Sequence, residues 1–75
     1  MTNNELKEAL KEQVLIMLEH ARKTLENKQK ARMSEADFRR AVGDKELATY
    51  NQYHAYGLSE GEQILARLIE AIKGE

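Results

Sequence analysis

The chain has 75 residues, and its 12 Lys and Arg against 13 Asp and Glu leave a formal net charge of −1. This length is typical of a single domain, here residues 1–75, and the absence of cysteine excludes disulfides and thiolate metal sites. No apolar run approaches the roughly 18 residues that would indicate a membrane span, and proline is absent, so we expect a soluble, cytoplasmic and mostly helical protein.

The first helix is expected to cover about residues 3–32. Thr2 and Glu5 have the spacing of a capping box, in which the threonine hydroxyl and the glutamate carboxylate each accept a backbone N–H. A stripe at helical spacing follows, formed by Leu6, Leu10, Val14, Met17, Ala21 and Leu25. The run from Val14 to Leu18 is apolar at every position, so it covers more of the helix surface than one neighbouring helix can bury.

A short connecting helix is expected over about residues 35–42. Ser34 with Asp37 resembles a new N-cap, which predicts that the first helix ends just before it. Phe38, Ala41 and Val42 would then form one small apolar face. Gly43 suits the end of this helix, and Asp44 suits the N-cap of the next one.

The last helix is expected over about residues 45–73. Its stripe steps by four and three residues through Leu47, Asn51, His54, Leu58, Gly61, Leu65, Leu68 and Ile72. Gly57, with Ser59 and Glu62 after it, could break the helix, because this group combines a stop signal with a second capping box. The stripe keeps its phase across Gly57, which favours one long helix.

Together these elements predict an all-α fold: an antiparallel hairpin of two long helices with the short helix between them. The residue numbers of facing positions should then sum to about 76, which places Leu10 opposite Leu65 and Val14 opposite Gly61. Such a pair leaves apolar surface unburied, so we expect a homodimer that forms a four-helix bundle. The dimer interface is predicted at Leu15, Ile16, Leu18, Ile64, Ile69 and Ile72.

Residues 22–45 carry eight Lys or Arg against four Asp or Glu, and all three tyrosines follow closely. A basic turn with nearby tyrosines could contact an acidic protein or phosphates. Equally, basic residues are favoured at a helix C-terminus, and tyrosines often line the edge of a core. The partner-binding residues predicted here are Arg32, Arg39, Arg40, Tyr50, Tyr53 and Tyr56.

Catalytic and cofactor-binding signatures are absent from the sequence. It contains no glycine-rich phosphate loop and no serine placed with a histidine and an acid in a known motif. His20 could meet His54 across the predicted hairpin, but no third ligand stands at helical spacing, so no metal is predicted. A helix-turn-helix match around Gly43 is weak, because Asp44 and Arg39 stand where apolar and small residues are usual.

We therefore expect a small non-enzymatic protein-interaction module, such as an adaptor, inhibitor or regulatory subunit, that acts through a homodimeric helical bundle and uses no cofactor or small-molecule substrate. One alternative is a nucleic-acid-binding regulatory protein that uses the basic segment 22–45. Another is a structural assembly component. Salt-dependent binding to generic DNA or RNA would distinguish the nucleic-acid alternative from the others.

Overall fold

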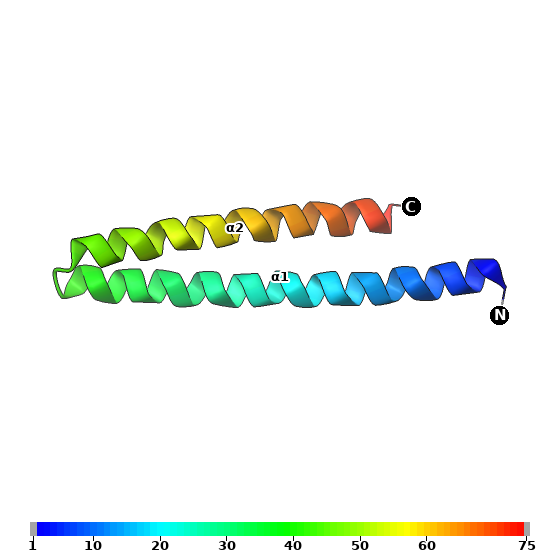
Figure 1. Ribbon diagram of the computed structural model, residues 1–75, viewed down its shortest axis with the longest axis horizontal. Coiled ribbons are helices and arrows are strands. Elements are labelled where there is room, and N and C mark those ends of the chain that lie inside the picture. The colour runs from blue at the N-terminus through cyan, green and yellow to red at the C-terminus, as the bar shows by residue number, and fades with distance from the viewer. Residues whose placement is uncertain (1, 75) are drawn as a thin grey trace.

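A computed structural model describes residues 2–74 of the chain. Two helices, α1 (Asn3–Ala41) and α2 (Lys45–Lys73), run antiparallel and pack side by side (Figure 1). The hairpin measures 62 × 16 × 11 Å, and α1 is ten residues longer than α2 (39 against 29). The N-terminal turns of α1 therefore project beyond the end of α2 (Figure 1). The predicted all-α antiparallel hairpin of two long helices is confirmed.

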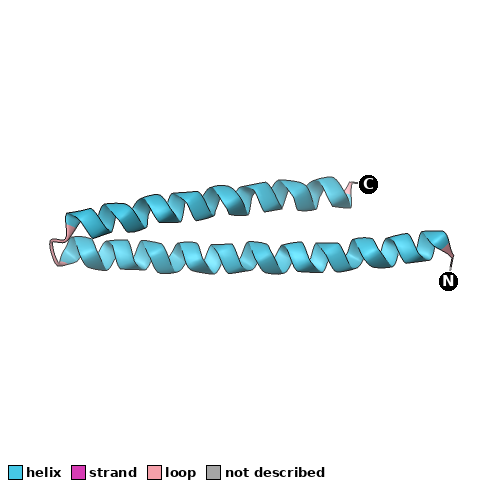
Figure 2. Cartoon of the chain, viewed as in Figure 1, coloured by secondary structure: helices cyan, strands magenta, loops and turns pink. Residues whose placement is uncertain are grey.

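The predicted short helix over residues 35–42 is wrong, because α1 continues through Ser34 to Ala41 (Figure 2). No glycine or proline precedes Gly43, so nothing in the sequence forces the chain out of the helix at Ser34. Ion pairs one helical turn apart span this region: Arg39 Nε lies 2.8 Å from Glu35 Oε1, and Arg40 Nη1 lies 3.3 Å from Asp37 Oδ1. These pairs favour an unbroken helix.

The turn between the helices consists of Val42, Gly43 and Asp44. Gly43 has a φ of 86°, a left-handed conformation that glycine adopts without strain. Asp44 N–H donates to the Arg39 carbonyl at 2.8 Å, and Gly43 N–H donates to the Arg40 carbonyl at 3.2 Å. These two bonds form a Schellman motif, which satisfies the last carbonyls of α1. Both predicted roles hold, since the Asp44 side chain also caps α2 by accepting the N–H of Leu47.

The predicted capping box at the start of α1 is also confirmed. Thr2 Oγ1 accepts the Glu5 N–H at 3.2 Å, and Glu5 Oε2 accepts the Thr2 N–H at 3.4 Å. The cap fixes the start of the part of α1 that has no neighbouring helix.

The two helices meet along one seam that steps by three and four residues on each helix, which is typical of a coiled coil. On α1 the half-buried or buried seam residues are Lys11, Leu15, Leu18, Arg22, Leu25, Gln29, Arg32, Ala36 and Arg39. On α2 and its N-cap they are Asp44, Ala48, Asn51, Ala55, Leu58, Glu62, Leu65, Ile69 and Ile72. The seam is apolar toward the open end and rich in alanine and polar residues toward the turn.

The predicted stripe of the last helix is only half in the seam. Asn51, Leu58, Leu65 and Ile72, which are every second member of the predicted series, lie there. The seam takes Ala48, Ala55, Glu62 and Ile69 in place of the residues directly before them. Small side chains such as these alanines allow the helix axes to approach closely. The displaced residues Leu47, His54 and Leu68 are left exposed.

The predicted register is wrong as well. The residue numbers of contacting pairs sum to 83 for Arg32 and Asn51, and to 84 for Arg22 and Glu62, rather than to about 76. A Cβ atom added to Gly61 would lie 3.4 Å from Leu25 Cδ1, so Gly61 packs against Leu25 and not against Val14. The shift follows from the continuation of α1, which moves the turn from the predicted short helix to Gly43.

Helix α2 runs through Gly57 without a break. The core is thin: its buried apolar residues are Ala36, Ala48, Ala55 and Ile69, and no large side chain among residues 2–74 is fully buried. Most apolar side chains of the hairpin therefore remain in contact with water.

Candidate interaction surfaces

Most of the exposed large apolar side chains lie on one face of the hairpin. On each helix, most of these residues come directly before a seam residue in the sequence. Val42 does not, but it lies one helical turn after Phe38, which does. In an antiparallel helix pair, the positions directly before the seam residues meet on the same side of both helices. This surface, which we call the apolar face, contains Leu10, Val14, Met17, Phe38 and Val42 from α1 and Leu47, Tyr50, Ile64 and Leu68 from α2.

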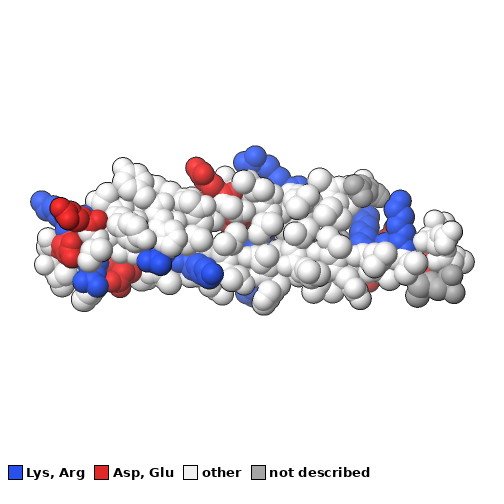
Figure 3. Space-filling view, viewed as in Figure 1, with Lys and Arg blue, Asp and Glu red and all other residues white. Residues whose placement is uncertain are grey.

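Residues from both helices line shallow grooves on the apolar face, so α1 and α2 both contribute to this one surface. Near the middle, Lys28 and Ala31 of α1 lie beside His54 and Leu58 of α2. At the open end, Leu10 and Val14 lie beside Ile72. On the broad face turned to the viewer in Figure 3, Lys, Arg, Asp and Glu side chains lie at both ends and at several places between them, with uncharged side chains covering the rest.

The opposite side of the hairpin is mainly polar. Contacts across it join the helices: Lys73 Nζ lies 4.0 Å from Glu19 Oε1, and Arg40 Nη2 donates to Gln52 Oε1 at 3.3 Å. We call this surface the polar face. It contains Glu12, Glu19, Lys23, Lys30 and Arg40 from α1 and Gln52, Ser59, Gln63 and Lys73 from α2.

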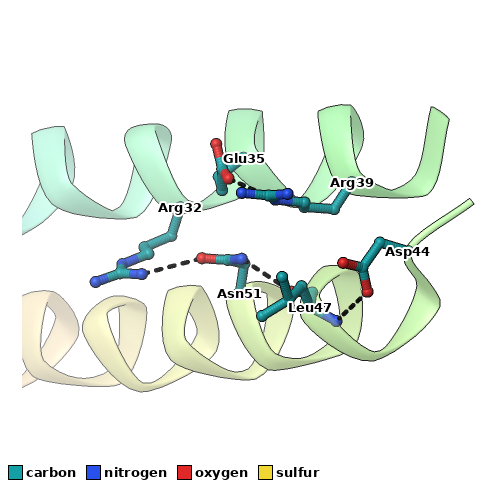
Figure 4. Close-up of polar contacts among 6 residues, drawn as sticks. All are labelled: Arg32, Glu35, Arg39, Asp44, Leu47 and Asn51. Carbon is teal, nitrogen blue, oxygen red and sulfur yellow. Dashed lines mark hydrogen bonds and ion pairs between the residues drawn. The ribbon is translucent and has the colours of Figure 1, made fainter. Parts of the chain in front are cut away.

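The arginines predicted to bind a partner are engaged within the hairpin. Arg32 is half-buried in the seam, and its Nη1 donates to Asn51 Oδ1 at 3.0 Å (Figure 4). Arg39 Nε donates to Glu35 Oε1 at 2.8 Å in the same region (Figure 4). Arg40 contacts Asp37 as well as Gln52. Carboxylates thus offset much of the positive charge at the turn.

The three tyrosines are all exposed, but they do not share one surface. Tyr50 lies on the apolar face, with its ring centroid 6.1 Å from that of His54. Tyr56 lies toward the polar face, where its hydroxyl accepts a hydrogen bond from Gln52 Nε2 at 2.7 Å. Tyr53 lies between them on the outer side of α2, with its ring edge-to-face with that of Tyr56. The six predicted partner-binding residues are therefore spread over the seam, the turn and two faces.

The residues predicted to form the dimer interface also separate into groups. Leu15, Leu18, Ile69 and Ile72 line the seam within one chain, and Ile69 is only 2% exposed. Ile64, 62% exposed, is on the apolar face, whereas Ile16, 65% exposed, points to the polar side. The sequence reasoning missed the other apolar-face residues, because it assigned the stripes of Val14 and Leu47 to the seam.

The two histidines do not meet. His54 lines a groove with Lys28, Arg32 and Glu35, whereas His20 lines another with Glu19 and Glu26. Within residues 2–74, no group of three His, Cys, Asp or Glu side chains is placed to hold a metal ion. Neither helix contains, over the same residues, an apolar stretch long enough to cross a membrane.

Comparisons with known proteins add no relative. The chain matches no protein-family model, no curated protein and no solved structure. The arguments about function therefore depend on the surfaces described above.

Proposed function

We propose that this protein is a small non-enzymatic interaction module that acts as a homodimer, with the apolar faces of two hairpins packed together into a four-helix bundle. The observation that carries the proposal is the one-sided distribution of apolar side chains. Met17 is 70% exposed, and Phe38, Val42 and Leu68 are also largely exposed on the same side. A concentration of exposed apolar side chains on one side of a molecule is typical of an interaction site.

The exposed area of the hairpin supports the same proposal. One chain exposes 5881 Å², whereas a compact monomer of 8.6 kDa would expose about 4,700 Å². The excess arises because the hairpin is long and only one helix pair thick. A standard protein interface removes about 800 Å² from each partner, which is about two thirds of the area by which one chain exceeds a compact monomer.

A homodimer of this kind leaves the polar face and the turn for a further protein, as an adaptor or regulatory subunit requires. The exposed side chains of Arg40, Tyr53 and Tyr56 remain outside the paired faces. Tyrosine and arginine are frequent contributors to protein interfaces. These residues are therefore our candidates for contact with the further protein.

Sedimentation equilibrium over a concentration series tests the homodimer. The proposal predicts a mass of twice 8.6 kDa at micromolar concentrations, with dissociation only on dilution. A single-chain mass at high micromolar concentration would refute it. Titration with generic DNA and RNA at low and moderate salt tests the nucleic-acid alternative, which requires binding that weakens steeply with salt.

A further inference from the structure

We infer that the two hairpins of the proposed homodimer pack with their turns at opposite ends. The inference rests on the proposed function and adds the orientation of the partner copy. A two-fold axis would lie between the two apolar faces. It would run across the width of the hairpin at the level of Lys28 and Gly57, perpendicular to the long axis. Each turn would then lie beside the open end of the partner copy.

The stripe that α2 contributes to the apolar face is nearly symmetric about Gly57. Tyr50 and Ile64 each lie seven residues from it, Leu47 and Leu68 lie ten and eleven residues from it, and His54 and Gly61 lie three and four. In an opposite-end pair, each Leu47 meets the partner's Leu68. The imidazole of each His54 faces the partner's Gly61, which has no side chain. Gly57 has no atom within 4 Å of an added Cβ, so close approach at the axis is sterically free.

The stripe of α1 has its centre at the same level. Val14 and Val42 are equally distant from Lys28, and Met17 and Phe38 are nearly so. Lys28 lines the same shallow groove as His54, which places the centres of the two stripes side by side across the hairpin. One axis therefore satisfies both helices.

The shape of the apolar face also permits packing with both turns at the same end, and charge decides between the two orientations. Residues 28–58, the half with the turn, carry six Lys or Arg against four Asp or Glu. Residues 2–27 and 59–74, the open half, carry six Lys or Arg against eight Asp or Glu. Opposite-end packing sets each positive half against a negative half, whereas same-end packing sets like charges together.

Distances between spin labels test the orientation, because the chain has no cysteine and a single introduced one is labelled uniquely. Lys45 is exposed at the turn, and Gln13 is exposed near the open end. With Lys45→Cys in both copies, the inference predicts a label separation of about 40 Å, given a helical rise of 1.5 Å per residue. A mixture of Lys45→Cys and Gln13→Cys chains should give a short separation, on the order of 15–20 Å.

The opposite result, a short Lys45 to Lys45 distance and a long mixed distance, would overturn the orientation and leave the homodimer intact. A single-chain mass for the labelled variants at the same concentration would remove the homodimer itself, and the orientation with it. The mass of each labelled variant therefore accompanies every distance measurement.

Discussion

Arg32 of α1 and Asn51 of α2 form a polar contact in the turn half of the seam. Arg32 Nη1 donates to Asn51 Oδ1 at 3.0 Å, and Asn51 Nδ2 donates to the Leu47 carbonyl at 2.8 Å (Figure 4). Asn51 is 3% exposed and is the buried polar residue of the seam, whose other buried residues are Ala36, Ala48, Ala55 and Ile69. A polar residue at such a position specifies the register of a coiled coil at some cost in stability.

Replacement of this asparagine should destabilise the hairpin. In Asn51→Ala, the half-buried Arg32 guanidinium loses its hydrogen-bond acceptor, so we expect a loss of about 1–3 kcal/mol in the free energy of unfolding. Urea denaturation at fixed protein concentration measures the loss. The double variant Arg32→Met with Asn51→Leu should recover most of it, because both polar partners are replaced by apolar ones. Equal stability of Asn51→Ala and the parent would contradict the assigned contact.

Gly43→Ala should lower stability through the turn. Its φ of 86° lies in the left-handed region, where a Cβ costs roughly 1–2 kcal/mol. Thermal unfolding measures the effect. Gly43→Asn serves as the control, because asparagine tolerates this conformation better and should lose less. A helix that simply continued through residue 43 would gain stability from alanine, and that result would exclude the Schellman turn.

Gly57→Leu should separate the stability of one hairpin from the stability of the dimer. Within one chain the new side chain meets open space, and leucine is a better helix former than glycine by about 1 kcal/mol. In the proposed dimer, two leucines would collide near the axis, and the dissociation constant should rise at least about tenfold, or 1.4 kcal/mol. Gln63→Leu places a leucine on the polar face, so its dissociation constant should stay near that of the parent.

Lys28→Met should strengthen association, because it removes a charged group from the middle of the apolar face while keeping a flexible chain of similar length. We expect a dissociation constant about tenfold lower, which corresponds to 1.4 kcal/mol. Lys30, exposed on the polar face and paired with Glu26 at 3.3 Å, provides the control. If Lys30→Met tightened the dimer as much as Lys28→Met, the gain would reflect general hydrophobicity rather than the apolar face.

The helical content, the antiparallel hairpin and the caps at Thr2, Gly43 and Asp44 could be predicted from the sequence, because each depends on local spacing or on one backbone conformation. The end of α1 could not. Ser34 with Asp37 has the pattern of an N-cap, yet a cap needs a chain that leaves the helix, and no residue before Gly43 makes it do so.

The candidate surface was predictable only in part, because the sequence carries two apolar stripes side by side. Leu47 and Ala48, like Leu68 and Ile69, are neighbours that each fit a helix contact. Which stripe becomes the seam depends on how closely the two helices approach, and helix spacing is a property of the packed pair. The register error, which placed Val14 opposite Gly61, followed from the misplaced turn.

The masses of Met17→Glu and Ile16→Glu test the central claim most directly. The two residues are neighbours with similar exposure, 70% and 65%, but Met17 lies on the apolar face and Ile16 on the polar side. Sedimentation equilibrium at a concentration where the parent is dimeric should give a single-chain mass for Met17→Glu and a two-chain mass for Ile16→Glu. Dimers from both variants, or monomers from both, would contradict the assignment of the apolar face as the interface.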